Sequence, residues 1–492
     1  MKKLLLFIGT AFGVTAGFIV VLTARYVPAE SAVQPAAGAI IPAGAAERLA
    51  GAIRIQTLSA DDEAAFDAAA FARLHGYLHI AFPLVRARLR REIVATHSLL
   101  YTWPGTDPSL KPILLAGHMD VVPVEPVTQD EWQQEPFGGR IADGYIWGRG
   151  AIDNKSTVLG TLEAVEMLLA EGVRPARTVY LAFGHDEEVG GSHGAREIAA
   201  LLTRRGVQLE MVLDEGGVIG DGVLPGITAP VALVGIGEKG FVTLALSARV
   251  SGGHSSLPPP QSAIGIVSAA IARIGENLMP ARLDGPTQQL FDRIGPWFPI
   301  AQRALFANLW LTRSFVTRRL ESRAATNAMV RTTMTPTMFQ AGTKDNVLPS
   351  YARAVVNVRI LPGDSIAKVL KHVERVVDDE RVEVTPSGRF SVEPSAVSST
   401  GSVAFRTLER SIRSVAPGVV VAPYLVVVVT DARHYSHLSP NIFRFLPLRL
   451  TSGDLERVHG VDERIGITEY ESAIRTYRQI VIQTACYADL SE

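Results

Sequence analysis

The chain has 492 residues, of which 47% are hydrophobic and 20% are charged, and this length has room for about two to four domains around a large core. Its 48 Lys and Arg residues balance 49 Asp and Glu residues, and the formal net charge of −1 excludes the strong basic surplus typical of nucleic-acid binding. The single cysteine, Cys486, excludes an intrachain disulfide framework and a thiolate metal cluster, so any metal must be held by nitrogen and oxygen donors.

The N-terminal segment, residues 1–27, has two lysines directly after Met1 and continues without a charge from Leu4 to Ala24. A run of this length can cross a bilayer core of about 30 Å, and no small-residue cleavage site follows it directly, so the sequence predicts an uncleaved signal-anchor, a transmembrane helix. The two lysines would stay in the cytoplasm and place the catalytic part in a periplasm or in an extracellular or luminal space. The alternatives are a cleaved signal peptide on a secreted protein and an ordinary buried helix. Residues 28–46 are rich in Ala, Pro and Gly and suit a linker.

Residues 47–236 alternate strand and helix patterns and are predicted to form the first part of an α/β catalytic domain. Three short apolar runs in it are each followed closely by Gly, His or an acidic residue, at 112–116, 178–183 and 211–213. Such alternation is typical of βαβ units and predicts a mostly parallel central sheet. Residues 393–492 resume the pattern and are expected to complete the domain.

Residues 237–392 are predicted to form an inserted α+β lid domain. GIGEKG, which begins at Gly235, has the glycine spacing of a dinucleotide-binding loop, but a strand pattern follows where that loop needs a helix, so we favour a turn between two strands. Residues 287–323 are a further insertion within the lid. We expect a packed helical hairpin there, with a surface for lipid or an apolar substrate as the alternative. Its large aromatic residues include Trp297, Phe298, Phe306 and Trp310.

Five short segments contain residues that could hold metal ions. Most of them follow a predicted strand, and in an open α/β sheet the ligand crevice lies beyond the carboxyl ends of the strands. Two imidazoles and several carboxylates at such positions are the donors that a pair of divalent cations needs. The segments contain His118 with Asp120, Asp153, Glu187 with Glu188, Asp214, and His459. The sequence therefore predicts a two-metal hydrolase.

The motifs GHMDVVP, GRGAIDNK, GHDEEVGG, LDEGG, GGHSSLPP, TDARHY and HGVDE occur in this order along the chain. In type, spacing and order they resemble the zinc metallopeptidase family of the aminoacylases, glutamate carboxypeptidases and succinyl-diaminopimelate desuccinylase. GHDEE and the long insertion look most like the branch of carboxypeptidase S and the N-fatty-acyl-amino-acid hydrolases. The resemblance covers roughly residues 55 to 485 and implies a metal-dependent exopeptidase fold.

By this resemblance, Asp153 is the carboxylate that bridges two zinc ions. His118 and Asp214 would complete one metal site, and Glu188 and His459 would complete the other. Manganese or cobalt would also suit these donors. A hydroxide shared by the two metals would be the nucleophile.

The resemblance also implies five residues that act around the metals. Asp120 would orient the His118 imidazole, and Glu187 would be the general base. His254, on the lid, would donate to the scissile carbonyl oxygen, from the same chain or from a second chain of a homodimer. The remaining two would contact the substrate: Arg433, which grips its carboxylate, and Asn346.

The predicted reaction is hydrolysis of the amide bond of an N-acyl amino acid, or removal of the C-terminal residue of a peptide. The aromatic insertion favours an apolar or fatty-acyl group on the substrate. One alternative is a cocatalytic metallo-aminopeptidase or dipeptidase, which recognises a free α-amine. Another is a membrane-tethered binding or scaffold protein with a degenerate site, which would not need a base such as Glu187.

Overall fold

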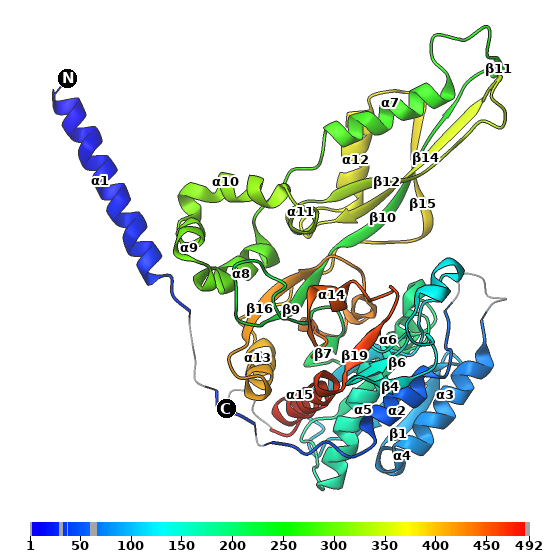
Figure 1. Cartoon of the computed structure of the whole chain (residues 1–492), viewed down its shortest axis with the longest axis vertical. Coiled ribbons are helices and arrows are strands. Elements are labelled where there is room, and N and C mark those ends of the chain that lie inside the picture. The colour runs from blue at the N-terminus through cyan, green and yellow to red at the C-terminus, as the bar shows by residue number, and fades with distance from the viewer. Residues whose placement is uncertain (1, 29–32, 37, 60–65, 488–492) are drawn as a thin grey trace.

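Ten strands form the central sheet, in the order β1-β2-β6-β3-β7-β17-β9-β8-β18, with β16 paired to β9. The computed structural model describes residues 2–28, 33–36, 38–59 and 66–487, and Figure 1 shows how the elements are arranged. Strands β2, β3 and β6 are buried along their whole length, which is why they read as unbroken apolar runs. The strands are β1 (Arg90–Val94), β2 (Ser98–Trp103), β3 (Ile113–His118), β6 (Val179–Gly184), β7 (Met211–Asp214), β8 (Ile219–Gly220), β9 (Val231–Glu238), β16 (Val420–Val426), β17 (Ile442–Arg444) and β18 (Arg449–Leu450).

This sheet is mixed, so the prediction of a mostly parallel sheet is wrong. Five strand pairings in it are parallel and four are antiparallel. The antiparallel pairings are those of β2 with β1 and β6, and those of β9 with β8 and β17. A buried strand has the same apolar pattern whether it runs parallel or antiparallel to its neighbour. The connection between the two strands sets their relative direction, and the pattern does not record it.

Helices pack on both faces of the central sheet. Alternate residues of β3 point to opposite faces, so Ile113 and Leu115 join one apolar core while Leu114 and Ala116 join another. Helices α2, α5, α13 and α15 contribute to the first core and α6 to the second. The helices of this part are α2 (Ala45–Ile53), α3 (Ala68–Ala81), α4 (Pro83–Arg88), α5 (Lys155–Ala170), α6 (Ala195–Arg204), α13 (Val403–Val415), α14 (Ser452–Leu455) and α15 (Ile467–Ala485).

A small antiparallel sheet joins two distant parts of the chain. It has the order β19-β5-β4, and its strands are β4 (Arg140–Ala142), β5 (Tyr145–Trp147) and β19 (Arg464–Gly466). Because β5 pairs with β19, the loop after β5 lies beside the loop before β19.

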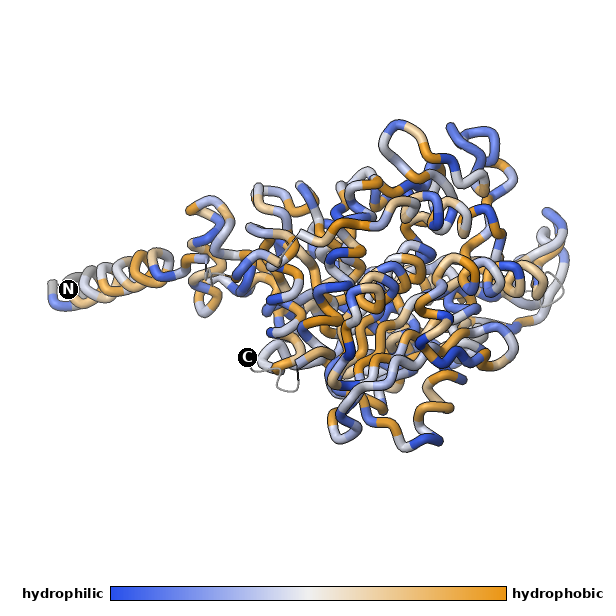
Figure 2. Tube along the Cα trace, turned by 90° about the horizontal axis from the view of Figure 1, so that it is seen from below, coloured by the Kyte–Doolittle hydropathy of each residue, from blue (hydrophilic) through white to orange (hydrophobic). Residues whose placement is uncertain are grey.

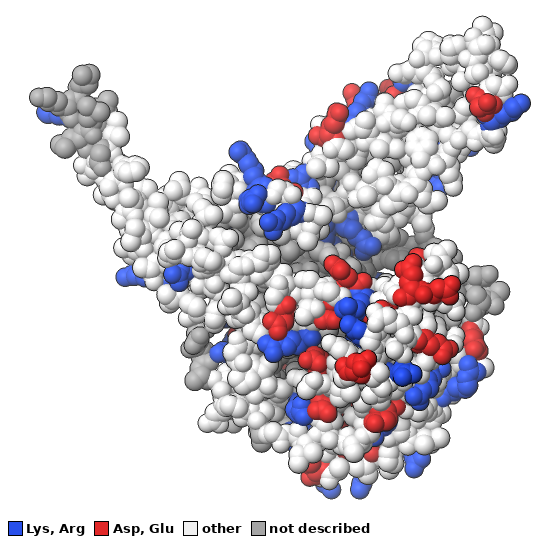
Figure 3. Space-filling view, in the orientation of Figure 1, with Lys and Arg blue, Asp and Glu red and all other residues white. Residues whose placement is uncertain are grey.

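A second sheet of four strands, in the order β12-β14-β10-β15, forms a separate unit with its own apolar core. Helices α7 and α12 pack against it, and a hollow separates this unit from the central-sheet part on the face shown in Figure 3. We call this unit the lid. Its elements are β10 (Gly240–Arg249), β11 (Gly253–His254), α7 (Ala263–Glu276), β12 (Thr333–Ala341), β13 (Val347–Leu348), β14 (Tyr351–Ile360), α12 (Ile366–Val377) and β15 (Val382–Val392).

The insertion between α7 and β12 consists of short helices that lie beside β16 (Figure 1). Phe291, Phe298 and Phe306 stack on one another, with ring centroids 4.7 and 5.3 Å apart. Trp310 is 57% exposed and touches Phe18 edge-on. The described ring contacts of Phe298 and Phe306 are therefore internal to the insertion. Its elements are α8 (Gly285–Ile294), η4 (Gly295–Trp297), α9 (Ile300–Ala307), α10 (Leu309–Glu321) and α11 (Ala324–Val330).

Residues Lys2–Arg25 form helix α1, which extends away from the rest of the chain (Figures 1 and 2). Over the part of the chain that the structure describes, no helix combines the length and the apolarity that a membrane span requires. The predicted transmembrane segment over residues 1–27 is thus not supported.

The described part of the predicted linker, residues 28–46, contacts the helices of the central part. The Ala36 amide donates to the Ser414 carbonyl oxygen, and Arg475 donates to the Ala39 carbonyl oxygen. Positions 29–32 and 37 of the predicted linker lie outside the described residues.

Candidate active site

Three strands of the central sheet end side by side at one edge. Strand β3 pairs in parallel with both β6 and β7. It ends at His118, β6 is separated by two residues from the 3-10 turn η3 (Glu187–Val189), and β7 ends at Asp214. Side chains that follow these strands meet at the carboxyl edge of the sheet, where open α/β folds bind ligands.

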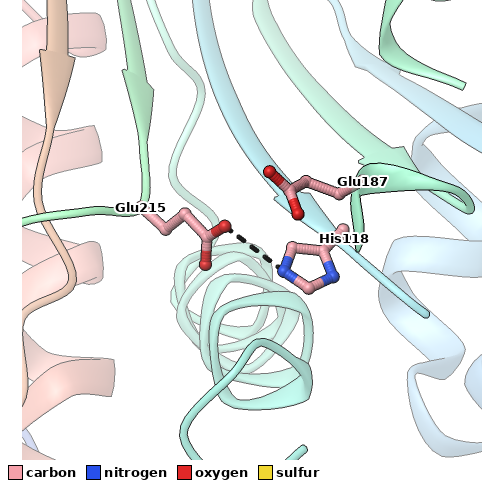
Figure 4. A group of neighbouring side chains, drawn as sticks. All are labelled: His118, Glu187 and Glu215. Atoms are coloured by element: carbon pink, nitrogen blue, oxygen red, sulfur yellow. Dashed lines mark ion pairs between the residues drawn. The ribbon is translucent and has the colours of Figure 1, made fainter. Parts of the chain in front are cut away.

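The His118 side chain lies at the centre of this group and is 1% exposed. Its Nε2 is 2.9 Å from Asp153 Oδ1 and 3.2 Å from Glu215 Oε1. Figure 4 shows Glu187 and Glu215 near the imidazole, carried by different segments. Two sets of donors have ligand atoms within 4.8 Å of one another: His118 with Glu187 and Glu215, and His118 with Asp153 and Glu188.

Asp153 connects this group to a second histidine. While Asp153 Oδ1 faces His118, its Oδ2 lies 3.1 Å from His459 Nε2, and that nitrogen is 3.3 Å from Glu188 Oε1. Each carboxylate oxygen of Asp153 thus faces a different imidazole, which is the placement expected of a carboxylate that bridges two cations.

Glu215, which the sequence prediction did not include, lies in the position expected of Asp214. Asn154 Nδ2 donates to Glu215 Oε2, and the other oxygen faces His118. The Asp214 carboxylate is buried, and its strongest charged neighbours are Glu238 and Arg444. Among the described residues, no donor group close enough to hold a metal includes Asp214. The sequence signal for this position is a pair of successive acidic residues, Asp214 and Glu215, at the end of an apolar strand. The pattern does not tell which of the two carboxylates faces His118.

Asp120 fixes the loop that carries the two glutamates. Its fully buried carboxylate accepts hydrogen bonds from the backbone amides of Glu187, at 3.3 Å, and Glu188, at 3.1 Å. Its Oδ1 lies 3.3 Å from His118 Nδ1, which is also 3.0 Å from the Asp120 carbonyl oxygen. One carboxylate therefore orients an imidazole and both glutamates.

Glu187 is a half-buried carboxyl group with no ion pair described for it. Burial raises the pKa of Glu187 well above its ordinary value, with His118 opposing the shift and the Glu215 and Asp431 carboxylates adding to it. Asp431 is another buried carboxylate of this region, and neither of its oxygens has a hydrogen-bond partner. A carboxyl group with a raised pKa suits general acid and base chemistry near neutral pH.

The electrostatics of the group fit divalent cations. Burial raises the pKa of Glu215 to about 8, and hydrogen bonds to Asp153 and Glu188 raise the pKa of His459 to about 10. Burial opposes a charge on His118, yet the Glu215 charge and hydrogen bonds to the surrounding carboxylates raise its pKa well above the ordinary value. Glu188 Oε1 is buried and faces His459 Nε2 at 3.3 Å. Without a metal, these imidazoles and carboxylates hold protons that balance their charges. Zinc, manganese or cobalt would replace those protons and balance the carboxylate charges instead.

Arg433 lies beside this group, in the 3-10 turn η5 (Asp431–Tyr435). Its Nη2 donates to the Gly190 carbonyl oxygen, immediately after η3, at 2.5 Å. The guanidinium also stacks on the Phe390 ring of the lid, 5.4 Å from its centroid. Arg433 is therefore placed at the junction of the lid and the central part.

His254 and Asn346 lie elsewhere in this chain. His254 is exposed in β11, at the end of the lid farthest from the central sheet (Figure 1), and Asn346 is next to it. The Ser255 amide donates to the Asn346 carbonyl oxygen, and His254 Nδ1 is 2.8 Å from Ser256 Oγ. The structure does not bring these two residues to the metal-binding group within one chain.

Comparison with known proteins shows similarity over most of the chain. Residues 114–483 match Peptidase family M20/M25/M40. A probable carboxypeptidase S-like 2 of Dictyostelium discoideum is 43% identical over 90% of this chain and 85% of its own length. An N-fatty-acyl-amino acid synthase/hydrolase PM20D1 of Xenopus tropicalis is 40% identical over 88% of this chain and 85% of its own length. The fold resembles that of an M20 family metallo-carboxypeptidase from Sulfolobus solfataricus, with a TM-score of 0.63 and 18% identity, over 89% of this chain and 98% of that one.

Proposed function

Because the chain belongs to Peptidase family M20/M25/M40, which confirms the resemblance seen in its motifs, we propose that it is a dinuclear zinc hydrolase that cleaves N-acyl amino acids. The family and its relatives make the chain an enzyme of the hydrolase class. The convergence of two imidazoles and two further carboxylates around Asp153 is the observation that supports the finer proposal.

His118, Asp153 and Glu215 would hold one zinc ion, and Asp153, Glu188 and His459 would hold the other. When bound, the two cations would polarise the scissile carbonyl group and lower the pKa of a water molecule between them. Asp120 keeps His118 and the glutamates in place through its contacts with their ring and backbone amides. The role of Asp214 as a ligand stays a prediction. Glu215 is the alternative ligand, because its carboxylate faces His118.

Glu187 would move the protons of the reaction. It would accept a proton from the attacking water and pass it to the nitrogen of the leaving amine, so that one water is consumed for each amide bond broken. The raised pKa of Glu187 supports this role, because such a carboxyl group both accepts and returns a proton readily.

Arg433 would bind the α-carboxylate of the amino-acid product. A planar guanidinium with five donors suits a bidentate contact with a carboxylate. A fatty-acyl group on the substrate is favoured by the relatives whose names specify N-fatty-acyl amino acids. Carboxypeptidase activity on peptides would use the same carboxylate contact, and the carboxypeptidase S-like relative supports it as the second candidate.

His254 and Asn346 require a change of arrangement before they can contact substrate. Either the lid closes on the central part, or a second copy of the chain supplies the two residues to the site. Both routes are compatible with their place on an exposed lid hairpin, β11 with β13. The second route makes a homodimer a proposal. A secreted location is a separate proposal, which does not depend on these two residues.

A substrate panel tests the proposed function. The zinc-loaded chain would be assayed on amino acids carrying acyl groups from N-acetyl to N-oleoyl, on N-blocked dipeptides and on dipeptides with a free α-amine. We expect turnover of the N-acyl amino acids, with the highest kcat/KM for long acyl chains. Preferential cleavage of the N-free dipeptides would support an aminopeptidase or dipeptidase and contradict the proposal.

A further inference from the structure

A buried ion pair joins the loop that carries Asp153 to the loop that carries His459. Arg149 follows β5 and is 2% exposed, and Glu463 precedes β19 and is fully buried. Arg149 Nη1 donates to Glu463 Oε2 at 2.7 Å. Neither residue belongs to the metal-binding group or takes part in the proposed reaction. Burial of two charges costs free energy of desolvation. That cost is offset only when the charges pair and their remaining donors and acceptors form hydrogen bonds.

The Glu463 carboxylate holds the Asp153 loop by its backbone. Its Oε1 accepts hydrogen bonds from the amides of Gly150, Ile152 and Asp153, at 3.1, 2.8 and 3.1 Å. Glu463 and Asp153 are 310 residues apart in the sequence. Three amides directed at one oxygen fix the position of the loop from which the Asp153 side chain extends.

The Arg149 guanidinium holds the His459 loop in a similar way. Its Nη2 donates to the carbonyl oxygens of His459, at 3.0 Å, and Gly460, at 3.2 Å. The His459 backbone has φ of 60°, in the left-handed region, which a residue with a side chain adopts only when its surroundings compensate the strain. Because 49% of the His459 side chain is exposed, burial of the imidazole does little to hold the turn. The turn is held by the carbonyl contacts with Arg149, together with the Gly460 amide that donates to the Arg457 carbonyl oxygen.

Neighbouring contacts hold the two loops close but do not aim the ligands. Strand β5 pairs with β19, and the Gly148 amide donates to the Glu463 carbonyl oxygen. The Arg464 guanidinium stacks over Trp147, 4.3 Å from the ring centroid. These contacts lie on the β19 side of Glu463, whereas the side chains of Arg149 and Glu463 reach the backbone of the ligands themselves.

We propose that Arg149 and Glu463 are positioning residues that set the separation of Asp153 and His459, and so determine occupancy of the zinc position formed by Asp153, Glu188 and His459. This inference rests on the proposed dinuclear function. The other zinc position has His118 and Glu215, which the ion pair does not contact, and should be affected less. Contacts that orient metal ligands typically contribute about 10–100-fold in metal affinity or activity.

A double variant separates positioning from general stability. Substitution of Arg149 alone would leave the Glu463 charge buried without its partner, and the chain could fail to fold for that reason. Arg149→Met together with Glu463→Gln removes both charges at similar volume, a change that buried ion pairs often tolerate. The matched control is Arg48→Met with Glu163→Gln, because Arg48 and Glu163 form another ion pair, between α2 and α5, and contact none of the proposed ligands.

Each full-length protein would be loaded with zinc, dialysed, and analysed for zinc per chain, for its thermal unfolding midpoint and for kcat and KM. Cobalt-loaded samples would add a visible spectrum that reports on ligand geometry. We expect two zinc ions per chain in the wild type and in the control. The Arg149/Glu463 double variant should fold, retain about one zinc ion, show an altered cobalt spectrum and lose about 10–100-fold in kcat.

Three outcomes would overturn the inference. One is a folded double variant with two zinc ions and an unchanged cobalt spectrum. Another is an equal loss of zinc in the control, which would assign the effect to buried ion pairs in general. A wild-type chain that binds no zinc would refute the proposed function together with this inference, whereas the first two outcomes leave the proposed function intact.

Discussion

Glu215→Gln and Asp214→Asn form a pair of neighbouring substitutions for which the structure predicts opposite results. Glu215 Oε1 faces His118 Nε2 at 3.2 Å, so the change to Gln replaces an anionic donor with a neutral one at the proposed metal position. We expect zinc affinity at that position to fall by about 100-fold, or about 2.8 kcal/mol. Residues that only orient a metal ligand contribute about 10–100-fold, and a direct ligand should reach the upper end of that range. The Asn154 amide that donates to Glu215 can still bond to the Gln oxygen, so folding should be preserved.

Asp214→Asn should leave zinc affinity unchanged and stabilise the metal-free chain. Burial raises the pKa of Asp214 from 3.8 to about 6. Because the folded pKa is the higher one, the buried charge costs stability above about pH 6, and the cost disappears below about pH 4, where both states are protonated. A difference of about two pKa units corresponds to roughly 3 kcal/mol at pH 7, which the neutral amide would remove.

Zinc titration against a chromophoric chelator would measure the affinities of the two variants. Urea unfolding in the presence of EDTA, at pH 7.5 and pH 5, would measure stability. If Asp214→Asn loses zinc and Glu215→Gln keeps it, the assignment of Glu215 is refuted and the prediction from the motif is restored. A stability gain that is equal at both pH values would contradict the role of the buried Asp214 charge.

Three further predictions follow from the site. Glu187→Gln should lower kcat by about 10²–10⁴-fold with zinc content unchanged, and an unaltered kcat would exclude Glu187 as the base. Because protonated His118 and His459 must each lose a proton to bind metal, zinc affinity should rise with pH between 6 and 8, and calorimetry in buffers of different ionisation enthalpy should detect at least two protons released per chain. Arg433→Lys should lower kcat/KM for N-acyl amino acids by about 10–100-fold but leave their methyl esters unaffected, and an equal loss on the esters would show that Arg433 does not bind the carboxylate.

His118, Glu187 and Glu188 lie close together because their motifs occur where neighbouring strands end. His118 and the Glu187–Glu188 pair follow apolar runs whose parallel pairing brings their ends together. The choice between Asp214 and Glu215 could not be made from spacing. Successive residues point in opposite directions as a strand ends, and only the position of His118 and Asn154 decides which carboxylate faces the metals.

The sequence was less informative about relations between distant parts. The direction of β9 relative to β8 and β17 depends on connections that an apolar pattern does not describe. The place of His254 relative to the site depends on how the lid is oriented, which no motif records. The prediction of a transmembrane helix over residues 1–27 is not supported by any of the described helices.

The central claim is that Asp153 lies between two divalent cations. Anomalous diffraction at the zinc absorption edge, from crystals of the zinc-loaded chain, tests it most directly. The account predicts two peaks about 3.5–4 Å apart, one on each side of the Asp153 carboxylate, with His118 and Glu215 beside one and His459 and Glu188 beside the other. A single peak, or peaks remote from Asp153, would contradict it.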